Sequence, residues 1–123
     1  MEQKLKMCCD MARALEFMHS LNPPLMHRDF KSHNCLVVSK KPTDPVMVKL
    51  SDFGLTVAGT FSVGREVDNC LWLAIEVMRG LEYTTKVDIY SLGITMWELL
   101  TAKDPFSEYG ITFLSTLEGQ IVD

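Results

Sequence analysis

Two short polar stretches hold the residues best suited to chemistry. The first is residues 27–34, with the sequence HRDFKSHN, and the second is residues 52–54, with the sequence DFG. Carboxylates accept protons, lysine places positive charge beside an anion, and aspartate and asparagine supply the oxygen ligands that a hard cation such as Mg²⁺ prefers. Taken singly, each stretch has a simpler explanation: Asp29 can pair with Arg28 at the surface, and the second stretch can form a turn.

Taken together, the two stretches resemble the eukaryotic protein kinases. The catalytic loop of that family reads H-R-D-x-K-x-x-N, and its metal-binding motif reads D-F-G. The resemblance implies phosphoryl transfer from ATP to a protein hydroxyl, which requires the hydroxyl to be positioned and charge on the phosphate oxygens to be neutralised. It also implies ATP and Mg²⁺ as cofactors and a protein as substrate.

The resemblance assigns a role to each polar residue. Asp29 accepts the proton of the substrate hydroxyl, and Lys31 places a positive charge beside the transferring phosphoryl group. Asn34 and Asp52 are the expected Mg²⁺ ligands. The expected catalytic residues are Asp29, Lys31 and Asn34, and the expected cofactor-binding residues are Lys31, Asn34 and Asp52. Lys31 is typical of serine/threonine-specific members.

Residues 52–76 resemble the activation segment, which runs from D-F-G to A-P-E in the family. Here the end reads Ala-Ile-Glu and finishes at Glu76, and the family's Gly-Thr before a tryptophan reads Asp68-Asn69 before Trp72. Asn69 can still form hydrogen bonds, but Asp68 adds a charge and narrows the backbone freedom that glycine would give. Substrate docking is the function that this change affects.

Three hydroxyl groups of this segment are candidate phosphorylation sites, and the resemblance implies that Arg28 would receive the phosphate, as the arginine at this position does in the family. The alternative is that they belong to ordinary loop residues. The three candidates are Thr56, Thr60 and Ser62.

Further residues are expected to support or regulate the site. A structural, hydrogen-bonded His27 is favoured over a metal site shared with His33, because their spacing is not helical and there is no third ligand. His19 and His33 are expected to be exposed. The full supporting set is His27, Arg28, Phe53, Gly54, Asn69, Trp72, Glu76 and Asp88.

Apolar periodicity predicts a mainly α fold with one small β-hairpin. A helix is expected over residues 5–21, ending at the Asn-Pro-Pro of residues 22–24. The hairpin pairs residues 35–38 with 46–50, and a long loop follows over residues 51–67.

The stretch 87–100 is apolar on nearly every side and predicts a buried helix. Its expected core residues are Met96, Trp97 and Leu100. In the family the aspartate at the position of Asp88 holds the catalytic-loop backbone, but with Thr85 it also fits a capping box. The first alternative is favoured, because a carboxylate in so apolar a helix needs a good buried partner.

Composition narrows the class of protein. The chain has 123 residues, 47% of them hydrophobic, which suits one domain, and a net charge of -4, which argues against a nucleic-acid partner. The four cysteines form no C-x-x-C pair, so we expect reduced, mostly buried thiols and a cytoplasmic location. No apolar run is long enough for a membrane span.

The resemblance covers most of the chain, from Cys8 to about Phe106, and is greatest to the tyrosine-kinase-like group. Neither a G-x-G-x-x-G loop nor a V-A-I-K-like lysine occurs in the sequence. We therefore expect residues 1–123 to be an incomplete larger (C-terminal) lobe that holds the catalytic loop, D-F-G, activation segment and central helix. The smaller lobe and the last helices are expected to be absent, and the fragment alone inactive. The alternatives are a non-catalytic kinase-like binding module and an inactive truncated product.

Overall fold

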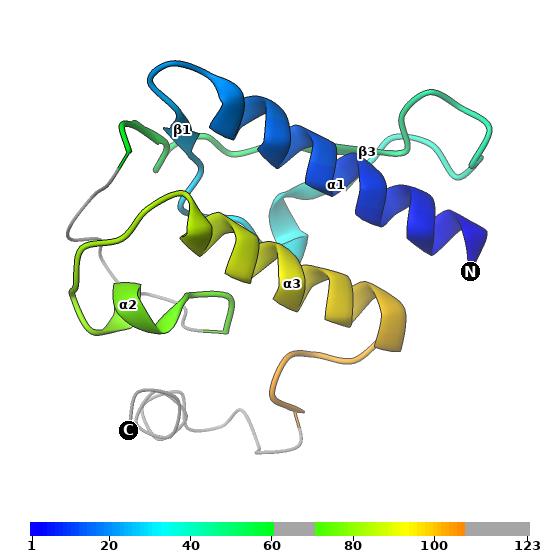
Figure 1. Ribbon diagram of the computed structural model, residues 1–123. Helices are drawn as coiled ribbons and strands as arrows, with labels where there is room; N and C mark the ends of the chain where they lie inside the picture. Colours follow the sequence, from blue (N-terminus) through cyan, green and yellow to red (C-terminus); the bar gives the residue numbers. More distant parts are fainter. Residues whose placement is uncertain (61–70, 108–123) are drawn as a thin grey trace.

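The computed structural model describes residues 1–60 and 71–107 (Figure 1). The expected mainly α fold with a small β-hairpin is confirmed. In chain order the elements are α1 (Glu2–Ser20), β1 (Leu25–Met26), the 3₁₀ turn η1 (Ser32–Asn34), β2 (Cys35–Val37), β3 (Val48–Leu50), β4 (Val57–Ala58), α2 (Ile75–Met78) and α3 (Lys86–Thr101).

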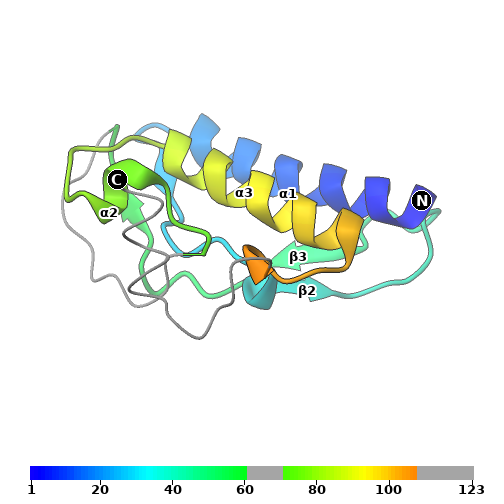
Figure 2. The same cartoon turned by 90° about the horizontal axis from the view of Figure 1, so that it is seen from below.

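The two long helices, α1 and α3, lie side by side and form one layer of the fold. Figure 2 shows the hairpin of β2 and β3 beneath this layer, and Figure 1 shows α2 beyond the N-terminal half of α3. In the hairpin Cys35 pairs with Leu50 and Val37 with Val48, in antiparallel register. This register brings the end of η1 beside the residues that follow β3.

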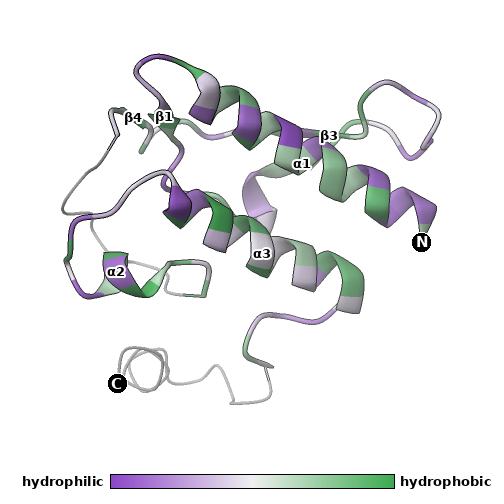
Figure 3. Ribbon diagram, viewed as in Figure 1, coloured by the Kyte–Doolittle hydropathy of each residue, from purple (hydrophilic) through white to green (hydrophobic). Residues whose placement is uncertain are grey.

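Helix α1 buries one apolar stripe. Its buried residues recur at helical spacing and include Cys8, Met11, Leu15 and Met18. They pack with Phe30, with Met47 and Val48 of the hairpin and with Leu92 of α3 in one hydrophobic cluster. Figure 3 shows the apolar and polar faces of both helices. The residues between α1 and β2 are thereby packed between the helices and the hairpin.

A second cluster lies at the other end of the fold. Met26 of β1 packs with Ala74, Val77, Tyr83 and Val87, and Val57 lies against it. It joins α2 to the start of α3.

Strand β4 is a feature that the sequence interpretation missed. Residues 51–67 were expected to form a loop, but Val57 pairs with Met26 and Ala58 with Leu25. The amide of Gly59 also donates to the carbonyl of Pro24 at 2.9 Å. A two-residue strand has no detectable period, so only the packing against β1 reveals it. Residues 61–67 lie outside the described part of the chain.

The expectation that α3 is buried all round was wrong. Its buried face holds Val87, Asp88, Ser91, Leu92 and Thr95. Trp97 is 38% exposed and Leu100 is 40% exposed, so neither is a core residue, whereas Met96 packs against the first cluster. Apolar composition does not decide burial by itself, because the described elements cover only one side of this helix.

The three cysteines in the described ranges are free thiols and form no disulfide. Cys8 is buried and Cys35 half-buried, but Cys9 is exposed, so the expectation of mostly buried thiols holds only in part. Cys70 lies outside the described residues. Within them, no helix has the length and hydropathy that a bilayer crossing requires.

Asp10 of α1 anchors the hairpin to the helix layer. Its Oδ2 atom accepts hydrogen bonds from the amides of Met47 at 2.7 Å and Val48 at 3.2 Å, and Oδ1 pairs with Lys6 at 2.6 Å. Burial raises the pKa of Asp10, but Lys6 and the two amides outweigh burial and hold the pKa below its ordinary value.

We predict that Asp10→Asn lowers the free energy of unfolding by about 2 kcal/mol at pH 7, because the two amides then bond to a neutral acceptor and the ion pair with Lys6 is lost. Since the folded-state pKa is depressed, this contribution is present at neutral pH and disappears as the pH falls through that pKa. Urea unfolding from pH 7 to pH 3 should show the difference from wild type shrinking in acid. Glu16→Gln, an exposed change on the same helix, is the control; a difference that persists unchanged at pH 3 would contradict the assignment.

Candidate active site

The polar stretch 27–34 connects β1 to β2 between the two helices and the hairpin. Its centre is fixed by Phe30, whose side chain is 2% exposed and belongs to the first hydrophobic cluster. The residues on both sides of this anchor therefore keep their places relative to the core. The stretch ends in η1, where the amide of Asn34 donates to the carbonyl of Lys31 at 3.0 Å.

His27 joins the two motif stretches. It is fully buried, its Nε2–H donates to the carbonyl of Ser51 at 2.9 Å, and its Nδ1 accepts from the amide of Asp29 at 3.1 Å. These two bonds together require the neutral imidazole protonated at Nε2. One ring thus links the backbone of Asp29 to the residue before Asp52, which is the structural role expected from the sequence.

Asp88, at the start of α3, holds the backbone where the polar stretch 27–34 begins. Its side chain is 1% exposed, and it accepts from the amide of His27 at 2.8 Å and the amide of Arg28 at 3.0 Å. His19 adds a third contact at 2.8 Å, between Nε2 and Oδ2. Thr85 makes no side-chain cap to the helix, so the capping-box alternative is not formed. His19 is half-buried and bonded, and the expectation that it is merely exposed was wrong.

Arg28 adopts a positive φ of 67°, a conformation that costs a non-glycine residue about 1–2 kcal/mol. The bond from its amide to Asp88 stabilises this conformation. Its side chain reaches the other segments: Nε donates to the carbonyl of Leu55 at 2.7 Å and Nη1 to the hydroxyl of Tyr83 at 3.1 Å. Arg28 therefore connects the polar stretch 27–34 to the residues after D-F-G and to the segment after α2.

Three of the expected site residues lie together. The Nδ2 atom of Asn34 donates to the carbonyl of Asp29 at 2.7 Å and to its Oδ2 at 3.3 Å. The Nζ atom of Lys31 lies 3.8 Å from Oδ1 of Asp29. Because the amide nitrogen of Asn34 is bonded to Asp29, its amide oxygen is the end left to bind a cation. The arrangement places a carboxylate, an ammonium group and an amide oxygen in one small region.

Asp52 follows Ser51, directly after the end of β3. The amide and hydroxyl of Ser51 both bond to the carbonyl of Asn34, at 2.8 and 2.9 Å, so Asp52 follows a residue fixed against η1. Asp52 is exposed, has a φ of 57°, and accepts from the amide of Gly54 at 3.3 Å. Phe53 is 53% exposed, and its ring meets His27 edge to face with centroids 5.4 Å apart.

Glu98 is a site residue that the sequence interpretation missed. One oxygen accepts from Ser32 Oγ at 2.9 Å, and the other accepts from Nε1 of Trp72. The buried Trp72 ring also meets the exposed His33 edge to face, with centroids 5.5 Å apart. The signal was available: Glu98, like Asp88, is a carboxylate in an apolar helix and needs a partner.

The remaining expected residues are Glu76, Asn69 and the three candidate phosphorylation sites. Glu76 is half-buried and forms no ion pair with any residue in the described ranges. Thr60 is exposed, whereas the Oγ1 atom of Thr56 is buried and has no hydrogen-bond partner among the described residues, so this conformation does not favour modification of Thr56. Asn69 and Ser62 lie outside the described residues.

In the part of the chain that the structure describes, no three His, Cys, Asp or Glu side chains gather as a metal site. The expected Mg²⁺ ligands are one amide and one carboxylate, Asn34 and Asp52, and so do not form a group of this kind. Both follow or precede a strand at the open end of the hairpin, Asn34 before β2 and Asp52 after β3, and the bonds of Ser51 to Asn34 join the two positions.

Comparison with known proteins agrees with the kinase resemblance of the two sequence motifs. A model of the family described as protein tyrosine and serine/threonine kinase matches residues 1–116. Two proteins of Dictyostelium discoideum, described as probable serine/threonine-protein kinases roco8 and roco5, are each 44% identical to the chain, over 96% and 98% of its length. A third from the same organism, probable serine/threonine-protein kinase pats1, is 37% identical over 98%.

The chain therefore belongs to the protein tyrosine and serine/threonine kinase family. The similarity is to proteins named as serine/threonine kinases, as the interpretation of Lys31 predicts. The aligned part covers 6%, 4% and 4% of the three relatives, so the chain spans only a small part of their length.

We predict that Asp88→Asn destabilises the protein by about 3 kcal/mol, because the amides of His27 and Arg28 bond to different carboxylate oxygens and one of these becomes an NH₂ donor. Hydrogen exchange should accelerate at the amides of His27 and Arg28. The exposed Asp104→Asn is the matched control. Wild-type protection of both amides in Asp88→Asn would show that Asp88 does not hold this backbone.

Proposed function

We propose that this chain forms the substrate-side half of a protein serine/threonine kinase active site. The observation that carries the proposal is the bonded group of Asp29, Lys31 and Asn34, held beside Asp52 through Ser51. Phosphoryl transfer needs mainly positioning and charge stabilisation, and these residues supply the groups for both.

In this proposal Asp29 is the general base. Its carboxylate orients the hydroxyl of the protein substrate and accepts its proton, and the Asn34 amide at 3.3 Å keeps the carboxylate in place. Lys31, 3.8 Å from the same carboxylate, stabilises negative charge that develops on the transferring group. The bond from the Asp29 amide to His27 keeps the backbone of the base fixed.

Asn34 and Asp52 would hold Mg²⁺. An amide oxygen and a carboxylate are hard oxygen donors, and Asp52 is exposed, so the donor set fits this ion. When bound, Mg²⁺ neutralises charge on the phosphate oxygens of ATP. The contribution of this chain is to keep the two ligands at neighbouring positions, through the two bonds from Ser51 to the carbonyl of Asn34.

We further propose that residues 1–123 are the central part of the larger lobe of a kinase in the tyrosine-kinase-like group. The sequence KSHN at residues 31–34 and Trp72-Leu73-Ala74 support this group. Groups that hold ATP from above, a glycine-rich loop and a strand lysine, would come from outside residues 1–123. A cytoplasmic location and a serine- or threonine-containing protein substrate complete the proposal.

The assignment of Asp29 as the general base can be tested with the variant Asp29→Asn of the full-length protein. We expect kcat to fall by about 10²- to 10⁴-fold, the usual contribution of general base catalysis, while nucleotide binding is retained. Phosphoamino-acid analysis of the wild-type product should show phosphoserine or phosphothreonine. Asp104→Asn serves as the control, and a product containing only phosphotyrosine would contradict the specificity assigned from Lys31.

A second prediction concerns residues 1–123 alone. We expect no phosphate transfer from labelled ATP to a basic protein substrate, because small errors in placing the nucleotide already cost orders of magnitude in rate. Water around the γ-phosphate would also weaken each electrostatic contact. The Asp29→Asn form of the same chain sets the background, and transfer above it would show that this half of the site is sufficient.

A further inference from the structure

One face of α3 carries a stripe of four polar residues, of which three are buried and the last, Glu98, is half-buried. Asp88, Ser91, Thr95 and Glu98 follow each other at intervals of three, four and three, which places them on one side of a helix. Asp88 holds the start of the catalytic stretch, and Glu98 bonds to Ser32 near its end. Ten residues of helix separate the two carboxylates, about 15 Å along the axis.

Both oxygens of Glu98 are used by groups from different segments. Ser32 is the first residue of η1, the turn that follows Lys31 and ends at Asn34. Trp72 precedes α2, and its backbone is also attached to α3, because Ser91 Oγ donates to its carbonyl at 2.5 Å. Glu98 is thus the junction between the turn that bears Lys31 and Asn34 and the segment before α2.

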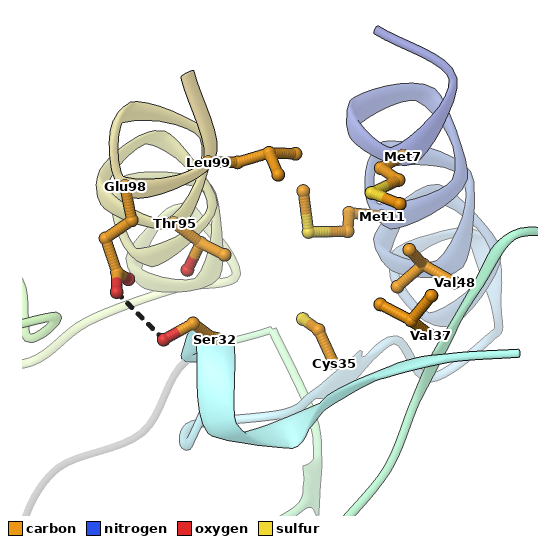
Figure 4. Close-up of a pocket in the computed structure, with 9 residues that line it drawn as sticks. All are labelled: Met7, Met11, Ser32, Cys35, Val37, Val48, Thr95, Glu98 and Leu99. Atoms are coloured by element: carbon orange, nitrogen blue, oxygen red, sulfur yellow. Dashed lines mark hydrogen bonds between the residues drawn. The ribbon is translucent and has the colours of Figure 1, made fainter. Parts of the chain in front are cut away.

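Two other side chains near Glu98, those of Thr95 and Cys35, donate their polar hydrogens to other groups. Figure 4 shows Glu98, Ser32, Thr95 and Cys35 at an open cavity of about 300 Å³ between α1, α3 and the hairpin, with the bond from Ser32 to Glu98 drawn. Thr95 donates to the carbonyl of Ser91 at 2.9 Å, and the Cys35 thiol donates to the carbonyl of Lys31 at 3.5 Å. Ser32 is therefore the residue of η1 that donates a hydrogen bond to Glu98.

The thiol of Cys35 reinforces the same turn. Burial, together with the nearby charge of Glu98, raises the pKa of Cys35 to about 12. The thiol consequently keeps its proton at neutral pH and remains a donor to Lys31. The carbonyl of Lys31 then has two donors, the Asn34 amide and this thiol.

We propose that Glu98 is a positioning residue of the phosphoryl-transfer site, which fixes η1 through Ser32 and ties it to Trp72, so that Lys31 and Asn34 keep their places beside Asp29. This inference rests on the proposed function. It adds to Asp88 a second carboxylate on the same helix, so that α3 sets both the start and the end of the catalytic stretch.

The hydrogen-bond chemistry separates three variants. Ser32→Ala removes the bond to η1 and leaves Trp72 bonded, and Glu98→Ala removes both bonds. Glu98→Gln can keep both, because its carbonyl accepts from Trp72, a donor only, while its NH₂ donates to the Ser32 hydroxyl, which also accepts. The exposed Glu16→Gln on α1 is the matched control.

In the full-length protein we expect Ser32→Ala and Glu98→Ala to lower kcat about tenfold with little change in the KM for ATP. Glu98→Gln should stay within about twofold of wild type, and the double variant Ser32→Ala/Glu98→Ala should be no slower than Glu98→Ala. A purely structural role would instead make kcat follow the loss of thermal stability, with Glu98→Gln as impaired as Glu98→Ala. That pattern, or an unchanged kcat in Ser32→Ala, would overturn the proposal.

A second measurement does not depend on activity. Hydrogen exchange at the amides of Asn34 and Cys35, which close η1, should be faster in Ser32→Ala than in wild type and unchanged in Glu16→Gln. Unchanged exchange in Ser32→Ala overturns the positioning role even if the protein is an active kinase. Faster exchange in a full-length protein without any kinase activity would support the fixing of η1 by Glu98 and remove the proposed function itself.

Discussion

The site depends on the hydrogen bonds that the carboxylate of Asp88 accepts. This carboxylate accepts two backbone amides and His19 in a nearly fully buried position. Hydrogen bonds to a charged group contribute about 1.5–3 kcal/mol each, which exceeds the cost of about 1–2 kcal/mol for the left-handed backbone of Arg28. With that conformation held, the side chain of Arg28 reaches Leu55 and Tyr83, and three segments distant in sequence become one unit.

The second constraint is the register of the β2–β3 hairpin. Pairing Cys35 with Leu50 sets Asn34 opposite Ser51, whose carbonyl is in turn bonded to His27. A shift by one residue would reverse which side chains face the core and would separate Asn34 from Asp52. The short hairpin is itself held by Asp10, so its geometry depends on α1 rather than on intrinsic strand stability.

Sequence reasoning located both motifs, both long helices and the hairpin, because each has a local signature in spacing or residue type. It favoured the tether at Asp88 for a physical reason, the cost of an unpartnered buried carboxylate. The same reasoning also predicts partners for the half-buried Glu98, but the sequence analysis did not apply it there. His19, strand β4 and the exposure of Trp97 and Leu100 had no local signal, because each depends on which other element is packed alongside.

The amino-acid sequence by itself determined the kinase family, the chemical identity of Asp29, Lys31, Asn34 and Asp52, and the order of helix, loop and hairpin. These follow from residue types at short spacings, which tertiary contacts do not alter. Only the tertiary structure decided that one face of α3 holds the polar stretch 27–34 at both ends and that His27 joins its backbone to the hairpin. Such hydrogen bonds connect residues 24 to 69 positions apart, and their formation depends on the packing of α1, α3 and the hairpin.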